Sequence, residues 1–318
     1  MSLFFNIVAA GALRKRTGVN PTPISAEIYD LTRPLYAGVD IVKSGFYFFK
    51  HYETADYQNA ACDKKYFFLY STDHNIGAGG LYLGKGNNLD LSDFVEVGLI
   101  HENYQAETPW YLEMDGISYL YYHTATEDPR NAGLQQTQLF TYSGPPAELH
   151  LMSLVAQDQP LGIFGDDNHT GYAKIYDIST NRVIATHIRK RGLPQPWARS
   201  VSTDRGLTFT REEDIDTKTG IETGYFFKPS IGTYFNFNGF QWYIGIIESD
   251  AGGSQKMIVG KSNGVDYSSI TQKAVIWPLD VLRVHSVKIV GTTAYVQFTR
   301  DVNSLFQGKY NLNNLYNF

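Results

Sequence analysis

The chain has 318 residues, of which 43% are hydrophobic and 19% charged, and its formal net charge is -5 at pH 7. This balance predicts a folded chain with a sizeable core, and the length suits one large β domain. The sequence contains no long basic run, so nucleic acid is not an expected partner. Its single cysteine, Cys62, excludes a disulfide framework within the chain.

Residues 1–13 are mostly apolar and precede a basic triplet at 14–16. A secretory signal peptide has its basic residues first, and a membrane-spanning helix needs a longer apolar stretch. We therefore expect neither a signal peptide nor a membrane span, and a soluble chain whose compartment, virion or cytoplasm, stays open. The apolar and then basic order suits an N-terminal arm that packs on its own domain or docks on a protein partner.

Strands and turns are favoured throughout by 23 tyrosines, 19 phenylalanines and 29 glycines. One unit recurs: a polar residue, a short apolar stretch, a turn and an aromatic strand. In its clearest copy, residues 107–122, Asp115-Gly116 separates two alternating segments, which is a strong hairpin signal. A second hairpin follows in each unit, for example at 80–100 and 256–276. The units recur at about fifty residues, the blade spacing of a propeller.

These repeats predict an all-β fold, a five-bladed β-propeller of four-stranded antiparallel blades over residues 36–318. Residues 1–35 form an arm and a closing strand in this prediction. The last unit lacks an outer strand, and the segment 26–31 would complete it and remove an exposed sheet edge. No segment combines helical periodicity with capping residues.

The pattern around Glu107-Thr108-Pro109, with Asp115-Gly116 and the aromatic strand 119–122, resembles the blade signature of five-bladed glycosidases. This is the arabinanase, xylosidase and invertase group, and the resemblance covers most of residues 40–300. Residues 81–100 are similar to its outer hairpin. The resemblance implies a central funnel that meets carbohydrate, with an Asp base, a pKa-tuning Asp and a Glu acid on the innermost strands.

A local resemblance concerns residues 202–209, which are similar to the Asp box of sialidases and related propellers. In such a turn the carboxylate of Asp204 would accept backbone N–H bonds, with Ser202 at the turn's start. Gly206 would take a positive φ, and Phe209 would pack beneath the turn. The role we expect for this box is structural.

Glycoside hydrolysis needs two carboxylates across the scissile bond. Glu107 and Asp56 lie at the same offset before the aromatic strands of their units, and Arg283 lies at that offset in the last unit. Glu107 is our candidate general acid and Asp56 the candidate base, with Asp40 as its rival. The alternative is that these carboxylates cap turns or meet solvent. The family's Asp-Pro opening is absent from the first unit, and the third unit has no clear third carboxylate.

Four residues are candidates for substrate binding. Arg283 or His285 would bind a sugar hydroxyl or carboxylate, and Asp158 lies near the matching position of the third unit. Trp110 would stack on a sugar face, or pack between blades. The loop 165–171 suits a calcium or zinc ion by its residue types, but an Asx-rich turn explains it equally, so we expect no metal and no cofactor.

Two functions follow. The first is a carbohydrate-recognising propeller that hydrolyses a polysaccharide. The second is a non-catalytic glycan-binding or structural component of a larger assembly such as a virion: an adhesin, or a tail or head accessory protein. The incomplete carboxylate set and the N-terminal arm favour the second, and the matched register of Glu107 and Asp56 favours the first.

Overall fold

The computed structural model describes residues 27–30, 49–53, 66–71, 80–87, 95–102, 107–115, 117–125, 135–142, 161, 170–179, 182–190, 196–264, 266–277, 281, 283–299 and 305–318. Apart from the 3-10 helix η3 (Leu312–Asn317), their secondary structure consists of strands, which confirms the all-β prediction. Within these ranges no helix has the length and apolar character needed to cross a membrane.

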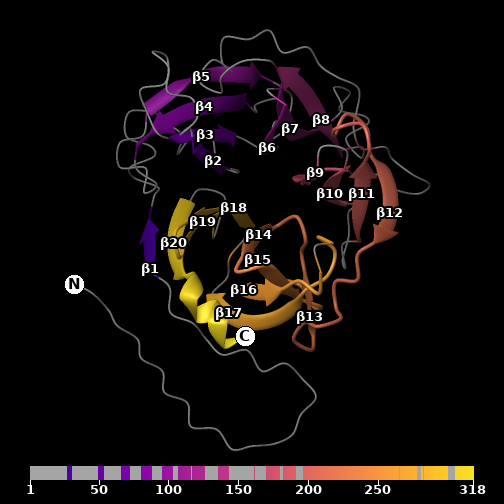
Figure 1. The fold of residues 1–318 in the computed structure, drawn as a ribbon, viewed down its shortest axis with the longest axis vertical. Helices are drawn as coiled ribbons and strands as arrows, with labels where there is room; N and C mark the ends of the chain where they lie inside the picture. The colour runs from indigo at the N-terminus through magenta and orange to yellow at the C-terminus, as the bar shows by residue number, and fades with distance from the viewer. Residues whose placement is uncertain are drawn as a thin grey trace, which may run out of the picture.

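The described strands form five antiparallel sheets, which Figure 1 shows arranged as a ring. In chain order the sheets contain β2 (Phe49–Glu53), β3 (Tyr66–Ser71), β4 (Gly80–Gly86) and β5 (Val95–Glu102); β6 (Glu107–Met114), β7 (Ile117–Ala125) and β8 (Gln135–Tyr142); β9 (Lys174–Ser179), β10 (Arg182–Ile188), β11 (Trp197–Ser202) and β12 (Thr210–Asp214); β13 (Tyr225–Phe227), β14 (Thr233–Phe237), β15 (Phe240–Ser249), β16 (Gln255–Lys261) and β17 (Thr271–Trp277); and β18 (Arg283–Val290), β19 (Thr293–Thr299) and β20 (Leu305–Asn311) with β1 (Glu27–Asp30).

Strand β1 joins the last sheet, as the sequence predicts for the segment 26–31. It pairs antiparallel with β20, so that Ile28 lies opposite Gly308. Strand β20 therefore has a partner on each side, which protects its edge. The rest of the predicted arm, residues 1–26 and 31–35, lies outside the described residues.

Three of the described sheets have the predicted four strands, and two differ. The sheet of β6, β7 and β8 has three strands in the described ranges. The sheet of β15 has five, because its inner strand is split into β13 and β14, which pair with the same edge. The hydroxyl of Tyr243 fills the split: it donates to the carbonyl of Lys228 at 2.6 Å and occupies the space where a Cβ on Gly232 or Gly245 would lie.

Two-residue turns close the inner hairpins where the sequence has its strongest turn signals. Met114 pairs with Ile117 around the Asp115-Gly116 turn, and Asp115 has a φ of 53°. Asn238 and Gly239 both have positive φ in the β14–β15 turn. Such values match the twist of the flanking strands, and Asp, Asn and Gly adopt them at low cost.

Aromatic side chains join neighbouring sheets through the core. The ring of Tyr176 on β9 lies 5.9 Å from Trp110 on β6, 5.7 Å from Tyr234 on β14 and 4.3 Å from Tyr267, measured between ring centroids. All four side chains are buried. Two of these ring pairs are edge to face and the Tyr176–Tyr267 pair is stacked, and such rings bury much apolar area between sheets whose backbones do not hydrogen-bond to one another.

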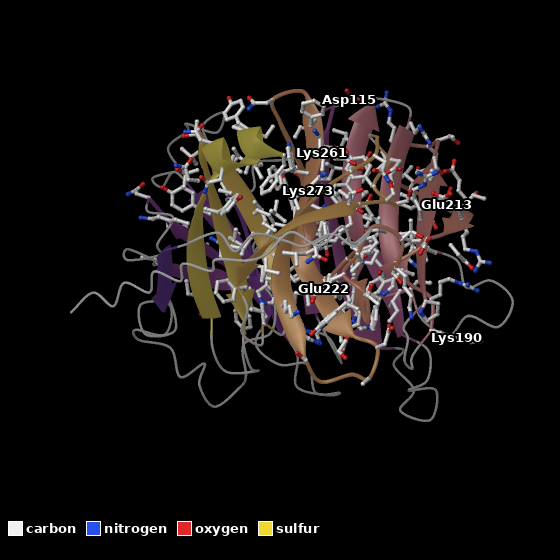
Figure 2. The ribbon with its side chains drawn as sticks, turned by 90° about the horizontal axis from the view of Figure 1, so that it is seen from below. Asp115, Lys190, Glu213, Glu222, Lys261 and Lys273 are labelled. Carbon is white, nitrogen blue, oxygen red and sulfur yellow. The ribbon has the colours of Figure 1, made fainter. Side chains whose placement is uncertain are left out.

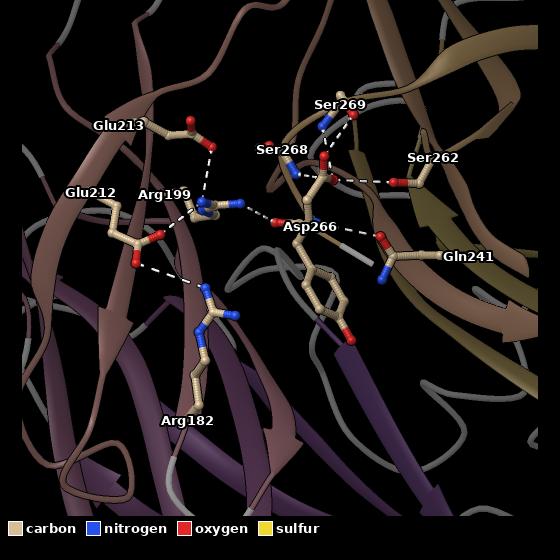
Figure 3. Close-up of polar contacts among 10 residues, drawn as sticks. Arg182, Arg199, Glu212, Glu213, Gln241, Ser262, Asp266, Ser268 and Ser269 are labelled. Atoms are coloured by element: carbon tan, nitrogen blue, oxygen red, sulfur yellow. Dashed lines mark hydrogen bonds and ion pairs between the residues drawn. The ribbon is translucent and has the colours of Figure 1, made fainter. Parts of the chain in front are cut away.

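A polar network fastens the β9–β12 sheet to the next one at their outer parts (Figure 3). Arg199 on β11 donates to the backbone carbonyl of Asp266 at 2.8 Å and forms ion pairs with Glu212 and Glu213. The Asp266 carboxylate accepts bonds from the serines at 262, 268 and 269. Because each group has several partners, the network holds the loop between β16 and β17 against β11.

The ring has two ends, which Figure 2 shows from the side. Asp115 and Lys261 lie toward one end, and Lys190 and Glu222 toward the other. Glu222 precedes β13, so the second end is where the inner strands begin. We call it the strand-start end, and the first the hairpin end.

Candidate site at the start of the inner strands

The inner strands bring two predicted residues to the strand-start end. Figure 1 shows β2, β6, β9, β14 and β18 around the centre of the ring. Glu107 is the first residue of β6, opposite His123 on β7, and Arg283 is the first residue of β18. The side chain of Glu107 lies outside what the structure describes, as do the candidate residues Asp56, Asp40 and Asp158.

Arg283, Tyr172 and His123 form a series of contacts at this end, which we call the outer level. The guanidinium carbon of Arg283 lies 4.7 Å from the ring centroid of Tyr172, which precedes β9. On its other side Tyr172 approaches His123, with 4.9 Å between the ring centroids. Arg283 and Tyr172 are both half-buried, whereas His123 is buried. Residues from three sheets therefore meet at this level.

The backbone of Tyr172 adopts a φ of 55°, a region that residues other than glycine seldom occupy. Such a conformation costs on the order of 1–3 kcal/mol and persists only where surrounding contacts impose it. Strained residues gather at binding and active sites, so this outlier marks the outer level as a functional candidate.

An inner level lies two or three residues further along the chain in each of these sheets and is buried. The amine of Lys174 on β9 donates to the backbone carbonyl of His285 on β18 and lies 4.3 Å from the ring centroid of Trp110 on β6. The sheet of β13–β17 separates the sheets of β9 and β18 in the ring. The contact between Lys174 and His285 therefore crosses the centre, and these three buried side chains form a floor beneath Arg283 and Tyr172.

Burial changes the proton affinities at the floor. Desolvation lowers the pKa of Lys174 to about 7, because the charged ammonium is taken out of water. Desolvation, the nearby Lys174 and Arg283 hold the pKa of His285 well below its usual value. His285 is therefore a neutral imidazole at neutral pH, which suits hydrogen bonding better than charge pairing.

A buried ion pair lies at the split between β13 and β14. Lys228, in the split between β13 and β14, pairs with Glu248 on β15, and their side chains are 11% and 8% exposed. Burial lowers the pKa of Lys228, the contact with Glu248 raises it, and the charge of Arg283 lowers it again.

The two remaining predicted binding residues lie in the floor. Trp110 is 6% exposed, packs against Tyr176 and donates from Nε1 to the carbonyl of Ile175 at 2.5 Å. These are the contacts expected if Trp110 packs between blades, which was the alternative to stacking on a sugar face. His285 is 4% exposed. Of the predicted binding residues that the structure describes, Arg283 is the one with a half-exposed side chain.

Three residues of this region were not singled out as site candidates from the sequence: Tyr172, Lys174 and Lys228. Lys174 alternates with buried Ala173 and Ile175 in an otherwise apolar segment, which is the signal that could have marked it. The strain at Tyr172 and the pairing of Lys228 with Glu248 depend on contacts between distant segments, so the sequence holds no local sign of them.

The turn at 202–209 lies between β11 and β12, outside this region. The Asp204 carboxylate accepts the backbone N–H of Thr208 at 2.9 Å, and the Ser202 hydroxyl accepts that of Gly206 at 2.7 Å. Gly206 has a φ of 82°, and Phe209 is buried. The turn docks on the neighbouring sheet, because Tyr121 donates to the Gly206 carbonyl at 2.9 Å. These contacts are structural in kind.

Metal ligands do not gather in the described part of the chain, where no group of three His, Cys, Asp or Glu side chains could hold an ion. Most of the loop 165–171, which the sequence left open between an ion site and a turn, lies outside the described residues.

No protein-family model matches the sequence, and no curated protein matches it. Solved structures do match the fold. A GH43_1 enzyme from Xanthomonas citri has a TM-score of 0.61 at 10% identity, with 90% of this chain and 91% of that chain covered. An endo-arabinase from Bacteroides thetaiotaomicron has 0.54 at 11%, covering 77% and 89%. A family 117 glycoside hydrolase from Zobellia galactanivorans has 0.53 at 12%, covering 84% and 92%. The chain therefore has the β-propeller fold of glycoside hydrolases.

Proposed function

We propose that the chain is a glycoside hydrolase that binds a polysaccharide at its strand-start end and uses Glu107 as general acid. The observation that supports this proposal is that the ring of His123, opposite Glu107 in the β6–β7 register, approaches Tyr172, which in turn lies beside Arg283, so that three sheets converge where the inner strands begin. Propeller hydrolases supply the fold-level support, which is an analogy and does not by itself assign activity.

The outer level suits a sugar. A guanidinium binds hydroxyl or carboxylate oxygens with two parallel donors, and the guanidinium carbon of Arg283 lies 4.7 Å from the Tyr172 ring centroid. In this proposal the buried floor of Lys174, His285 and Trp110 limits how far a chain end can enter. A sugar at the outer level would lie beside the first residue of β6, which is where an acid must protonate the leaving oxygen.

The reaction needs a second carboxylate, for which Asp56 and Asp40 are our candidates. In the proposed step the Glu107 carboxyl gives its proton to the glycosidic oxygen while the bond to the anomeric carbon breaks. The second carboxylate removes a proton from the attacking water, or attacks the anomeric carbon itself. Asp56→Asn and Asp40→Asn variants, assayed separately, identify which of the two acts.

The test of Glu107 uses a panel of polysaccharides and aryl glycosides. In Glu107→Gln we expect turnover of unactivated substrates to fall roughly 100- to 10,000-fold, while dinitrophenyl glycosides, whose leaving group needs no proton, keep most of theirs. The acid-requiring limb of the pH profile should disappear. Glu113→Gln, later on the same strand, is the matched control and should keep wild-type turnover. Equal turnover in Glu107→Gln and wild type on polysaccharide would refute the acid assignment.

A further inference from the structure

Exposed aromatic side chains gather at the hairpin end. Phe240 and Tyr316, which are 51% and 67% exposed, are the two most exposed large apolar side chains in the described part of the chain. Phe237 joins them: it lies opposite Phe240 across the β14–β15 turn, and its ring centroid is 6.0 Å from that of Tyr316. We call these three residues the hairpin-end aromatics. Rings that form one group leave a larger apolar patch in water than scattered rings would, and such patches mark interaction sites.

The helix η3 places Tyr316 in this group. It begins directly after β20, and the backbone N–H of Leu312 donates to the carbonyl of Thr292, in the β18–β19 turn, at 2.8 Å. Figure 2 shows η3 at the same end of the ring as Lys261, whose amine lies 3.6 Å from the ring centroid of Phe240. The helix thus runs from a turn of the last sheet to a turn of the preceding sheet, and the aromatic patch spans both.

The direction of β1 brings the N-terminal arm to the same end. Strand β20 ends at η3, and β1 runs antiparallel to it, so β1 begins at the hairpin end with Glu27 opposite Lys309. The chain before Glu27 therefore joins β1 at the end that carries the exposed aromatics. Residues 3–13 of this arm are mostly apolar and contain no charged residue, so the neighbouring Lys261 neither attracts nor repels them.

The connection between the apolar segment and β1 is long enough to reach the patch. Residues 14–26 span up to about 40 Å when extended. Crossing a four-stranded sheet from its outer to its inner strand takes about 15 Å, and a neighbouring sheet lies about 10 Å further. A segment attached by a short linker has an effective concentration on the order of millimolar, far above that of a second copy in dilute solution. These magnitudes favour docking within one chain.

We propose that residues 3–13 dock on the hairpin-end aromatics of their own chain. Docking removes the exposed rings of Phe240 and Tyr316, and the aliphatic and aromatic side chains of the segment, from contact with water, which is the favourable term. The docked segment lies at the opposite end of the ring from the candidate site. The inference therefore does not depend on the proposed function, and the strand-start end stays open to a saccharide.

The experiment measures amide hydrogen exchange of the full chain by mass spectrometry and follows the peptides that cover residues 3–13. In the wild type we expect these amides to exchange about tenfold more slowly than those of a synthetic peptide of the same sequence. In a double variant with Phe240→Ser and Tyr316→Ser, exchange should return to the rate of the peptide. Leu207→Ser is the matched control, since Leu207 is a 41% exposed apolar side chain in the turn at 202–209, and it should leave the protection unchanged.

Two results of the exchange experiment would overturn the inference. If residues 3–13 of the wild type exchange as fast as the synthetic peptide, the segment is not docked. If their protection survives in the folded double variant, they dock elsewhere. Protection that is lost on dilution would mean that the arm binds a second copy, and the docking within one chain would then be wrong.

A cross-link tests the same contact without changing the patch, so it decides the inference even if the double variant fails to fold. A photoreactive residue is placed at position 5 of the otherwise wild-type full chain. We expect it to cross-link to residues 236–242 or 312–318 and to give a product with the mass of one chain. Cross-links to other segments, or a product with the mass of two chains, would contradict the proposal. Thermal melting of each variant shows whether it is folded.

Discussion

The burial of Lys174 leads to a prediction about how the free energy of unfolding depends on pH. Its pKa is lowered from 10.5 to about 7 in the folded chain, whereas the unfolded chain restores the ordinary value. Between these two values the unfolded state binds the extra proton, so the free energy of unfolding rises with pH. Replacing Lys174 by Met removes this contribution and keeps a side chain of similar length.

The magnitude follows from the shift. A drop from 10.5 to about 7 corresponds to about 5 kcal/mol between the protonation states, at about 1.4 kcal/mol per unit. Between about pH 7.5 and 9.5, the contribution of Lys174 to the free energy of unfolding should rise by about 2–3 kcal/mol. Higher pH is avoided because burial raises the pKa of Tyr121 and Tyr176, whose ionisation in the unfolded state then lowers stability.

The assay is urea unfolding of the wild type and Lys174→Met at several pH values in this window. The wild-type free energy should rise more steeply than that of the variant, and the difference between the two changes is the quantity predicted. Lys218→Met serves as the control, since that side chain is 55% exposed, and its slope should match the wild type. If the free energies of unfolding of wild type and Lys174→Met changed with pH in parallel, the conclusion that the Lys174 amine is buried in the floor would be wrong.

Three further substitutions test the contacts around the site and the turn. Asp204→Ala removes the acceptor of three bonds in its turn and should lower the free energy of unfolding by about 1–2 kcal/mol in urea titrations. Gly206→Ala should cost more, because φ is positive and the new Cβ would lie 2.5 Å from the Tyr121 hydroxyl; Tyr121→Phe should recover part of that cost, and purely additive effects would contradict the contact. Lys228→Met leaves the buried Glu248 without its cation and should cost about 3–5 kcal/mol, whereas adding Glu248→Gln should restore stability.

The strands and turns were predictable because their signals are local. The Asp115-Gly116 pair specifies a two-residue turn, and the alternation on either side specifies the paired strands. The outer strand β1 was predictable from an incomplete last unit. The placement of Arg283 at the start of an inner strand followed from its register within the repeats.

The floor of the site was not predictable, because it depends on contacts between distant segments and has no local signal. Lys174 lies far in sequence from His285 and Trp110, and nothing near it in the sequence indicates that these groups meet. The split of the inner strand into β13 and β14 depends on the Tyr243 hydroxyl entering space left by Gly245 on β15 and by Gly232, which precedes β14. Contacts between distant segments decide such features, and a single sequence does not encode them in its local patterns.

The central claim, carbohydrate at the strand-start end, is tested most directly by a crystal structure with the tightest-binding oligosaccharide of the panel. The account predicts density for a sugar against Tyr172 and Arg283, above the buried floor and within hydrogen-bonding reach of Glu107. A sugar bound at the hairpin end near Asp115 and Lys261, with the strand-start end empty, would contradict it.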